Sequence, residues 1–302
     1  GLPFVSHCID VANILIDWNM DHTTVVSALL HDIVEDTEVK LSDIEEEFGS
    51  DVALLVDGVT KVENIAFRSK KHKQAENFTK LFLSLARDLR VIIIKFADRL
   101  NNMETIQYLS SKKQKEIALE TKEIFVPLAH RLGMAQLKWK LEDLSLKCLD
   151  LRAFNGIKKK IETSSRLNED ILSNAIKPIK SELNTYKIKS NIFGRYKSIS
   201  SIQRKIEKSG KKFEEIYDLY AIRIVVDKIE ECYLALGVIH SIYPPIQDRF
   251  KDFIATPKTN GYQSIHTTVL TKDNRLTEFQ IRTKDMDYTA EVGVAAHWLY
   301  KG

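Results

Sequence analysis

Residues 31–37 read HDIVEDT and directly follow the apolar run VVSALL at residues 25–30. The apolar run is typical of the buried stripe of a helix. This core helix is therefore expected to end in four ionisable groups: His31, Asp32, Glu35 and Asp36. Burying unpaired carboxylates is costly, and acidic groups oppose the dipole at the C-terminal end of a helix. Either the turn faces water, or a positively charged group lies against it.

Two other helical stretches supply groups that could share a cation with this turn. His7 lies in HCIDVANIL, and Asp98 lies in KFADRLNNM, with Phe96, Ala97 and Leu100 marking the packed side of that helix. Imidazole with carboxylate is the ligand mix expected for Mn, Fe or Zn rather than for Ca. A lone histidine is more often a satisfied core or surface residue. The order H…HD…D on successive helices is much more specific for a metal site.

Composition bounds the class of protein. The chain has 302 residues with a net charge of +3, and no apolar run approaches the roughly 20 residues that span a bilayer. Its first residues lack the order of a signal peptide. The three cysteines, Cys8, Cys148 and Cys232, are far apart and odd in number, which argues against a disulfide framework. We therefore expect a cytoplasmic protein with no membrane partner.

The two halves of the chain differ in charge. Residues 1–110 carry a net charge of −7, and the remaining residues carry +10. An acidic half could hold cations, and a basic half could hold phosphates on nucleotides or on nucleic acid. Uneven decoration of the surface is the alternative that charge alone leaves open.

Periodicity predicts two kinds of architecture. Residues up to about 150 show apolar spacing typical of helices, and 135–190 stay helical but highly charged. From Asn191, β-branched runs at 219–226, 265–271 and 277–283 are separated by turn signals. We expect an all-α domain, a helical connector, and an α+β domain with a mixed or antiparallel sheet.

The stretch at 194–212, GRYKSISSIQRKIEKSGKK, holds seven Lys/Arg and one acidic residue. On a helix, Lys197, Ser201 and Lys205 would form one stripe able to follow a polyphosphate. A solvated basic face or a nucleic-acid patch would look the same from charge alone.

The strand patterns place acidic and basic groups beside that stripe. Glu278, Gln280 and Arg282 share one face of the strand at 277–283, opposite Phe279 and Ile281. Asp218 directly precedes the strand at 219–226, and Arg223 lies within it. A Mg²⁺ ion between Asp218 and Glu278 would neutralise a triphosphate, and phosphoryl transfer needs little more than such positioning. A half-exposed strand is the plainer reading.

The helical half resembles the hydrolase domain of RelA/SpoT homologues, within the HD-domain phosphohydrolases. The motifs that carry the resemblance are HDIVEDT, LVDGVTK at 55–61 and IIIKFADRLNNM at 92–103. The resemblance implies Mn²⁺-dependent removal of the 3′-pyrophosphate of (p)ppGpp. It implies Mn²⁺ ligands at His7, His31, Asp32 and Asp98. It implies water activation by Glu35 and Asp36, and nucleotide contacts from Asn102 and Thr105.

The second half resembles the (p)ppGpp synthetase domain of the same family, through GRYKSISSIQRK, YDLYAIRI, RFKDFIATPKTNGYQSIHTTV, EFQIRT and AEVGVAAHWLYK in that order. That domain moves the β,γ-pyrophosphate of ATP to the 3′-hydroxyl of GDP or GTP and releases AMP. The resemblance implies adenine stacking by Arg195 and Arg223, and phosphate binding by Lys197, Ser201 and Lys205. It implies Mg²⁺ binding by Asp218 and Glu278, with Glu278 as base. Tyr262 would stack on guanine, beside contacts from Lys251, Asn260 and His266.

The resemblance predicts a bifunctional enzyme of the stringent response. It implies a hydrolase domain at 1–134, a helical connector bundle at 135–190 and a synthetase domain at 191–302. RFKD at 249–252 resembles the basic version of a motif that synthetase-only members carry in acidic form. We expect ribosome or tRNA contact only through C-terminal modules absent from this chain, and an N-terminal basic stretch of the hydrolase site to be missing. Two alternatives remain open. The chain could be a fragment that only synthesises or only hydrolyses (p)ppGpp, or it could be an RNA- or ribosome-binding module.

Overall fold

The computed structural model describes residues 4–63, 88–210, 213 and 220–298, which belong to two compact units. The first unit comprises Gly1–Phe125 and Ala295–Gly302, and the second comprises Val126–Val294. Within the described part of the chain, no helix has the length and apolar character needed to cross a membrane.

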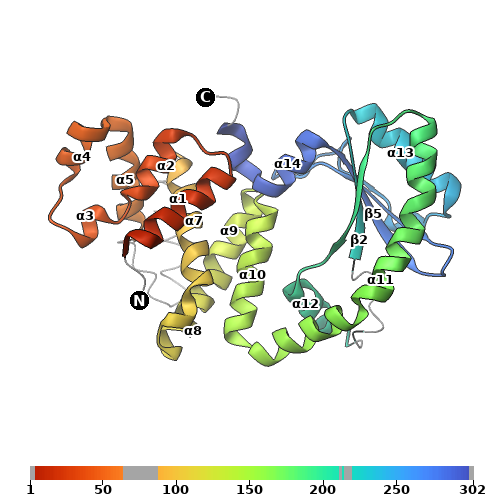
Figure 1. Cartoon of the computed structure of the whole chain (residues 1–302), viewed down its shortest axis with the longest axis horizontal. Helices are drawn as coiled ribbons and strands as arrows, with labels where there is room; N and C mark the ends of the chain where they lie inside the picture. Colours follow the sequence, from red (N-terminus) through yellow and green to blue (C-terminus); the bar gives the residue numbers. More distant parts are fainter. Residues whose placement is uncertain (1–3, 64–87, 211–212, 214–219, 299–302) are drawn as a thin grey trace. The chain divides into compact units, whose positions relative to one another are not determined.

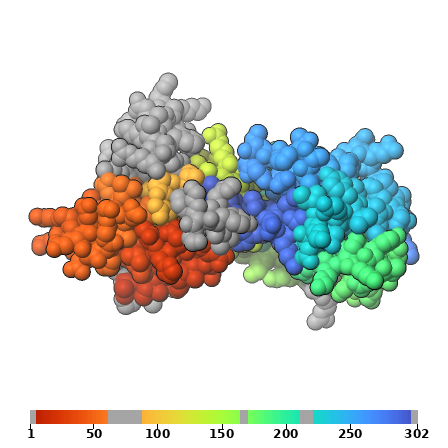
Figure 2. All heavy atoms as spheres, turned by 90° about the horizontal axis from the view of Figure 1, so that it is seen from above, coloured from red at the N-terminus to blue at the C-terminus, as the bar shows by residue number. Residues whose placement is uncertain are grey.

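The first unit is built from helices and contains no strand among its described residues. Its elements are α1 (Phe4–Asp17), α2 (His22–Leu29), α3 (Ile33–Asp36), α4 (Leu41–Phe48), α5 (Ser50–Glu63), α7 (Arg90–Glu104), the 3₁₀ turn η1 (Ile106–Tyr108), α8 (Ser111–Glu120) and the π-helical turn η2 (Thr121–Phe125). Figure 2 shows this unit with α1 in red and the segment of α4 and α5 in orange. The all-helical character predicted from periodicity is confirmed.

Helix α7 forms the centre of this unit. Ile92, Ile93, Ile94 and Phe96 are all fully buried, so the helix is covered on nearly every side. The run VIIIKF, which read alone could form a strand, lies inside this helix.

The second unit combines helices with one sheet. Its elements are α9 (Val126–Arg131), α10 (Ala135–Leu149), α11 (Leu151–Thr185), β1 (Asn191–Tyr196), α12 (Ile199–Ser209), β2 (Tyr220–Val226), α13 (Ile229–Ile242), the 3₁₀ turn η4 (Gln247–Arg249), β3 (Lys251–Asp252), β4 (Ile265–Leu270), β5 (Leu276–Thr283), α14 (Lys284–Val292) and the 3₁₀ helix η5 (Gly293–Trp298), which runs past its end. The three strands predicted from sequence are present. Strands β1 and β3 were not predicted.

The sheet is mixed, with the order β1-β2-β5-β4-β3. Strands β2 and β5 are parallel, and the other neighbours are antiparallel. Its apolar face packs against α11 and α13, in a core that includes Ile179, Ile222, Ile239 and Phe279. Figure 1 shows α11 and α13 on that side of β2 and β5. Helix α11, expected as part of a connector, thus shares the core of the sheet.

The turn between α9 and α10 lies directly against the end of α14. Gly293 has a φ of 60°, and a Cβ added there would collide with the carbonyl oxygen of Leu132. The N–H of Val294 donates to the same oxygen at 2.9 Å. Only glycine allows this approach at a positive φ, so Gly293 fixes α10 beside the polar face of the sheet.

Candidate active sites

The first candidate site gathers side chains from three places in the first unit. His7 comes from α1, His31 and Asp32 from the turn after α2, and Asp98 from α7. The Nε2 atom of His7 lies 3.3 Å from Asp98 Oδ1 and 3.8 Å from Asp32 Oδ2. The Nε2 atom of His31 lies 3.0 Å from Asp32 Oδ1. The structure therefore brings together all four residues predicted as metal ligands, which we call the HD cluster.

Hydrogen bonds behind the HD cluster set the tautomers of both histidines. The Nδ1 atom of His31 donates to the carbonyl oxygen of Ala28 at 2.6 Å, and that of His7 donates to Asn101 Oδ1 at 2.7 Å. Each Nε2 of a neutral ring therefore presents a lone pair to the carboxylates. His31 is fully buried, and its Nε2 has no hydrogen-bond partner. One divalent cation between these atoms would satisfy all of them.

Burial and neighbouring charges shift the pKa values of the two carboxylates of the HD cluster in opposite directions. Burial alone would raise the pKa of Asp98, but the charge of Lys95, 2.6 Å away, and the hydrogen bond from His7 lower it strongly. Burial raises the pKa of Asp32. The pKa of His7 is raised, chiefly by its hydrogen bond to Asp98.

The helix that precedes the HD cluster ends earlier than predicted. Helix α2 stops at Leu29, and His31 and Asp32 lie in a turn rather than on a helix. The ring of His31 occupies the Ala28 carbonyl that the N–H of Asp32 would use in a continuous helix. Glu35 and Asp36 then lie in the first turn of α3, where acidic groups are favourable. The expected conflict with the helix dipole is wrong.

The structure also places the other residues that the sequence predicted around this site. Glu35 and Asp36 are exposed. Asn102 Nδ2 donates to Asp98 Oδ1 at 2.6 Å, and Thr105 Oγ1 donates to the carbonyl oxygen of Asn101 at 2.9 Å. Sequence reasoning missed Lys95 and Asn101, although helical spacing places both within one turn of Asp98. It also missed Cys8, which lies next to His7 in sequence.

The second candidate site is the polar face of the sheet in the second unit. The register places Arg223 beside Gln280, and Gln280 beside His266. Glu278 is the next residue on this face of β5, and Lys251 lies opposite His266 on β3. Strand alternation predicted this face for Glu278, Gln280 and Arg282, but Arg282 is 1% exposed rather than half-exposed. Tyr262 and the carboxylates of α14 cover it.

A line of hydrogen-bonding groups crosses this face. The hydroxyl of Tyr262 lies 2.7 Å from His266 Nε2, and His266 Nδ1 lies 3.1 Å from Glu278 Oε1. Lys197 Nζ lies 3.2 Å from the other oxygen of Glu278. Burial would raise the pKa of Glu278, but His266 and Lys197 outweigh it and lower that pKa strongly. Glu278 is therefore a carboxylate at neutral pH.

Three arginines meet the acidic residues of α14 on the same face. Arg195 and Arg223 bind the same atom, Glu291 Oε1, at 3.1 and 2.6 Å. Asp287 binds Arg223 and Arg282, each at 3.0 Å. The guanidinium carbon of Arg195 also lies 3.8 Å from the ring centre of Trp139. Burial and the charge of Arg223 lower the pKa of Arg195 to about 10.

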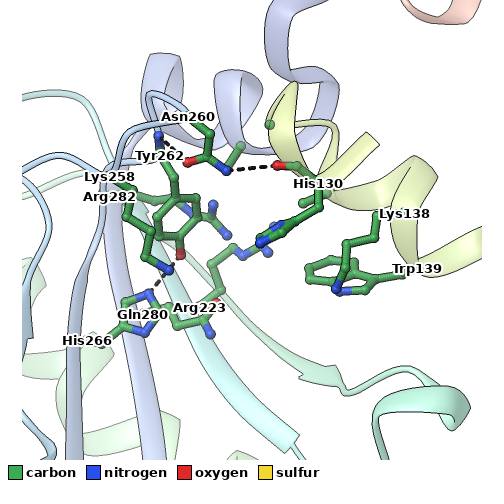
Figure 3. Close-up of a pocket in the computed structure, with 13 residues that line it drawn as sticks. His130, Lys138, Trp139, Arg223, Lys258, Asn260, Tyr262, His266, Gln280 and Arg282 are labelled. Atoms are coloured by element: carbon green, nitrogen blue, oxygen red, sulfur yellow. Dashed lines mark hydrogen bonds between the residues drawn. The ribbon is translucent and has the colours of Figure 1, made fainter. Parts of the chain in front are cut away.

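Two adjoining pockets open on this face. Figure 3 shows the first, a cavity of about 220 Å³. Four residues that the sequence predicted as site residues line it: Arg223, Asn260, Tyr262 and His266. Asn260 Nδ2 donates to the carbonyl oxygen of His130, which holds the loop before β4 against α9. Arg282, which strand alternation placed on this face, also lines the cavity, but sequence reasoning missed the basic residues His130, Lys138 and Lys258.

The second pocket has a volume of about 160 Å³ and is lined by Arg195, Lys197 and Ser201, with Trp139 shared between the two pockets. Lys197 precedes the N-cap residue Ser198, so the predicted helical stripe contains only Ser201 and Lys205. Strand β1 extends to Tyr196, so Lys197 lies in the link between this strand and α12. Lys251 is exposed on β3, and Asp218 lies outside the described residues.

Comparisons with known proteins agree with this division of sites. A model of the HD domain matches residues 1–135, and a model of the region found in RelA/SpoT proteins matches residues 194–302. Together these domains imply the use of divalent metal ions.

Curated relatives match along the whole chain. It is 44% identical over 302 residues to a guanosine-3′,5′-bis(diphosphate) 3′-pyrophosphohydrolase from Spiroplasma citri. It is 42% identical over 301 residues to the bifunctional (p)ppGpp synthase/hydrolase SpoT from Escherichia coli. Both matches cover 100% of this chain but 40% and 43% of the relatives. A solved metazoan ortholog of SpoT is 31% identical, over 47% of this chain and 79% of that one, with a TM-score of 0.38.

Proposed function

This chain belongs to the RelA/SpoT family, and from that premise we propose that it both makes and degrades (p)ppGpp in the stringent response. The HD cluster would hydrolyse the 3′-pyrophosphate, and the polar face of the sheet would form it. The observation that carries the proposal is that both constellations are assembled in one chain, each within its own unit. Because the chain spans less than half of its curated relatives, their further activities are not carried over.

For synthesis, the proposal assigns the two pockets to two nucleotides. The pocket with Arg195, Lys197 and Ser201 would take ATP, and the pocket with Asn260, Tyr262 and His266 would take GDP or GTP. Tyr262 offers a ring for guanine, and Arg195 and Arg223 offer guanidinium planes for adenine. Phosphate contacts are proposed for Lys197, Ser201, Lys205 and Lys251.

Glu278 contacts one lining residue of each pocket, His266 of the first and Lys197 of the second. We assign it the proton of the 3′-hydroxyl. That oxygen would bond to the β-phosphorus of ATP while the bond to the oxygen bridging the α-phosphorus breaks and AMP leaves. Lys197 holds Glu278 at 3.2 Å, and a triphosphate that draws Lys197 away would make the carboxylate a better base. Asp218 and Glu278 are the proposed Mg²⁺ ligands.

For hydrolysis, the HD cluster fits a single divalent cation, which we assign as Mn²⁺ held by His7, His31, Asp32 and Asp98. Such a cation supplies a water of lowered pKa and stabilises charge on the phosphate under attack. Lys95 and Asn101 orient Asp98 and His7 from behind. Glu35 and Asp36 follow Asp32 at the exposed side and would accept the proton of the water. Asn102 and Thr105 are the proposed nucleotide contacts.

The proposed organisation keeps the predicted limits: hydrolase at 1–134, connector helices at 135–190 and synthetase at 191–302. The substrates ATP, GDP or GTP and (p)ppGpp would place the protein in the cytoplasm. Ribosome or tRNA contact would belong to other parts of the longer relatives.

The test is to incubate the protein with ATP, GDP and Mg²⁺, and separately with ppGpp and Mn²⁺, and to resolve the nucleotides. We expect AMP and ppGpp in the first reaction, and GDP with pyrophosphate in the second. Glu278→Gln should lower synthesis by about 10²–10⁴-fold and leave hydrolysis unchanged. Asp98→Asn should do the reverse. Glu207→Gln, an exposed change on α12, is the matched control. Salt-sensitive RNA binding without either reaction would contradict the proposal.

A further inference from the structure

A thiol that none of the proposed roles uses lies beside the HD cluster. Cys8 follows His7 on α1 and is 6% exposed. Its Sγ, a ring nitrogen of His31 and a carboxylate oxygen of Asp32 all lie within 4.8 Å of one another. His7, His31 and Asp98 meet the same condition, so the two triplets share His31.

These separations suit one ion. Metal bonds to sulfur and nitrogen are about 2.3 and 2.0 Å long, so two donors on one ion lie up to about 4.3 Å apart. Small rotations of Cys8 and Asp32 would therefore place both donors on an ion that also touches His31.

A second observation points to a ligand at this place. His31 is fully buried, its Nδ1 is engaged by the carbonyl oxygen of Ala28, and its Nε2 has no hydrogen-bond partner. A buried acceptor without a donor is costly unless something binds it. His31 is common to both triplets, so an ion bound to this residue would lie near Cys8.

We propose that Cys8 is a sulfur ligand of the metal ion in the HD cluster, and that it shifts the preference of this site toward softer cations such as Zn²⁺ and Co²⁺. The inference rests on the metal site proposed above. On binding, the thiol loses its proton to solvent and the thiolate forms the bond to the metal. Thiolate favours Zn²⁺ over Mn²⁺, whereas imidazole and carboxylate alone accept either ion.

The first test reads the sulfur directly in the unaltered chain. We expect X-ray absorption of the protein loaded with one equivalent of Zn²⁺ to show one sulfur neighbour at about 2.3 Å. The variant Cys148→Ser, altered at a half-buried residue of α10 in the other unit, should give the same spectrum. A shell of nitrogen and oxygen alone would overturn the proposal, whatever the variants do.

The second test uses Co²⁺, whose bond to thiolate gives charge-transfer absorption in the near ultraviolet. Cys8→Ser should abolish this band and weaken Co²⁺ binding at least as much as the loss of an outer-shell partner, about 10- to 100-fold. Binding of Mn²⁺, followed by the paramagnetic resonance of the free ion, should change far less. A band that survives in Cys8→Ser would overturn the proposal. If the unaltered chain bound none of these metal ions, the metal site proposed above would itself be overturned.

Discussion

The two candidate sites differ in how their charges are balanced. In the HD cluster, two imidazole nitrogens and two carboxylates face one another, and Lys95 is the cation that binds Asp98 at 2.6 Å. On the polar face of the sheet, cations and anions are already paired. Glu291 binds two arginines, Lys197 binds Glu278, and Asp143 accepts the N–H groups of Ile199 and Ser200 at the start of α12.

The comparison separates two ways of preparing a site. The HD cluster turns imidazole nitrogens and carboxylate oxygens toward one another, so a cation should bind there with little rearrangement. The sheet site is self-neutralised, so a polyphosphate must displace carboxylates from Arg195, Lys197 or α12 before it binds. Arg195 and Arg223 meet at one oxygen of Glu291, which leaves no room for an adenine ring between them until one of them moves.

The largest expected effect tests the charge balance of the HD cluster. Lys95 and Asp98 form a buried pair, with side chains 6% and 5% exposed. Removing one partner of such a pair leaves an uncompensated charge, so Lys95→Met should lower the free energy of unfolding by about 3–5 kcal/mol without metal. Saturating Mn²⁺ should reduce this cost, because the ion replaces the lost positive charge. Denaturant unfolding with and without MnCl₂ measures both values.

Lys112→Met, an exposed change on α8 of the same unit, should have little effect under either condition. If Lys95→Met lowered the free energy of unfolding equally with and without Mn²⁺, the assignment of the HD cluster as a cation site would be contradicted.

A second prediction assigns each ligand to one unit. A ligand at a hundred times its dissociation constant stabilises the folded state by about 2.7 kcal/mol. Mn²⁺ should therefore protect amides of α7 from hydrogen exchange, and an ATP analogue with Mg²⁺ should protect β2 and β5. Mass spectrometry of peptides from the two units measures this. Protection of β2 and β5 by Mn²⁺ alone would mean that the separation of the two sites is wrong.

Much of the fold was predictable because apolar periodicity is a local property. The helices of the first unit, the long charged helices at 135–190 and three of the strands follow from it directly. Strand β1 was missed because Gly194 and the basic residues around it mask the alternation, while its pairing with β2 is a long-range contact. The end of α2 was misplaced because it depends on a hydrogen bond from the ring of His31 to the backbone.

The candidate sites were predictable only in part. Motifs identified the residues that the structure gathers at the HD cluster and on the sheet. They could not show which charges already bind one another. Trp139 on Arg195 and Glu291 between two arginines come from helices distant in sequence, and such pairings depend on the tertiary fold. Their roles, like those of the predicted site residues, remain predictions.

A third prediction tests the paired arginines. Glu291→Gln removes the charge that holds Arg195 and Arg223 together, so the proposed adenine slot should open more often. If the open form is a minor state, binding of an ATP analogue should strengthen, by about tenfold. Calorimetric titration measures the affinity. Asp285→Asn changes an exposed carboxylate of the same helix and should leave the affinity unchanged. Weaker binding in Glu291→Gln would indicate that Glu291 contacts the nucleotide instead.

The smallest expected effect concerns the scaffold of the HD cluster. Asp21 caps α2 by accepting the N–H of Thr24 at 3.0 Å, and it lies 3.5 Å from Arg90 at the start of α7. Burial would raise the pKa of Asp21, but the bonds from Thr24 and the charge of Arg90 lower it below its ordinary value of 3.8. Its contribution to stability is therefore present above that ordinary value and is lost as the pH falls through the lower folded pKa.

Asp21→Ala should accordingly lower the free energy of unfolding by about 1 kcal/mol at neutral pH and by less in strong acid. Asp21→Asn keeps a good N-cap but loses the pair with Arg90, so it should cost less than alanine and remove the pH dependence. Metal affinity should hardly change in either variant, because His31 and Asp98 keep their own supporting bonds to Ala28 and Lys95. If Asp21→Ala instead weakened Mn²⁺ binding about tenfold, as the loss of an outer-shell partner does, the HD cluster would depend on the joint between α2 and α7 rather than on those nearby bonds.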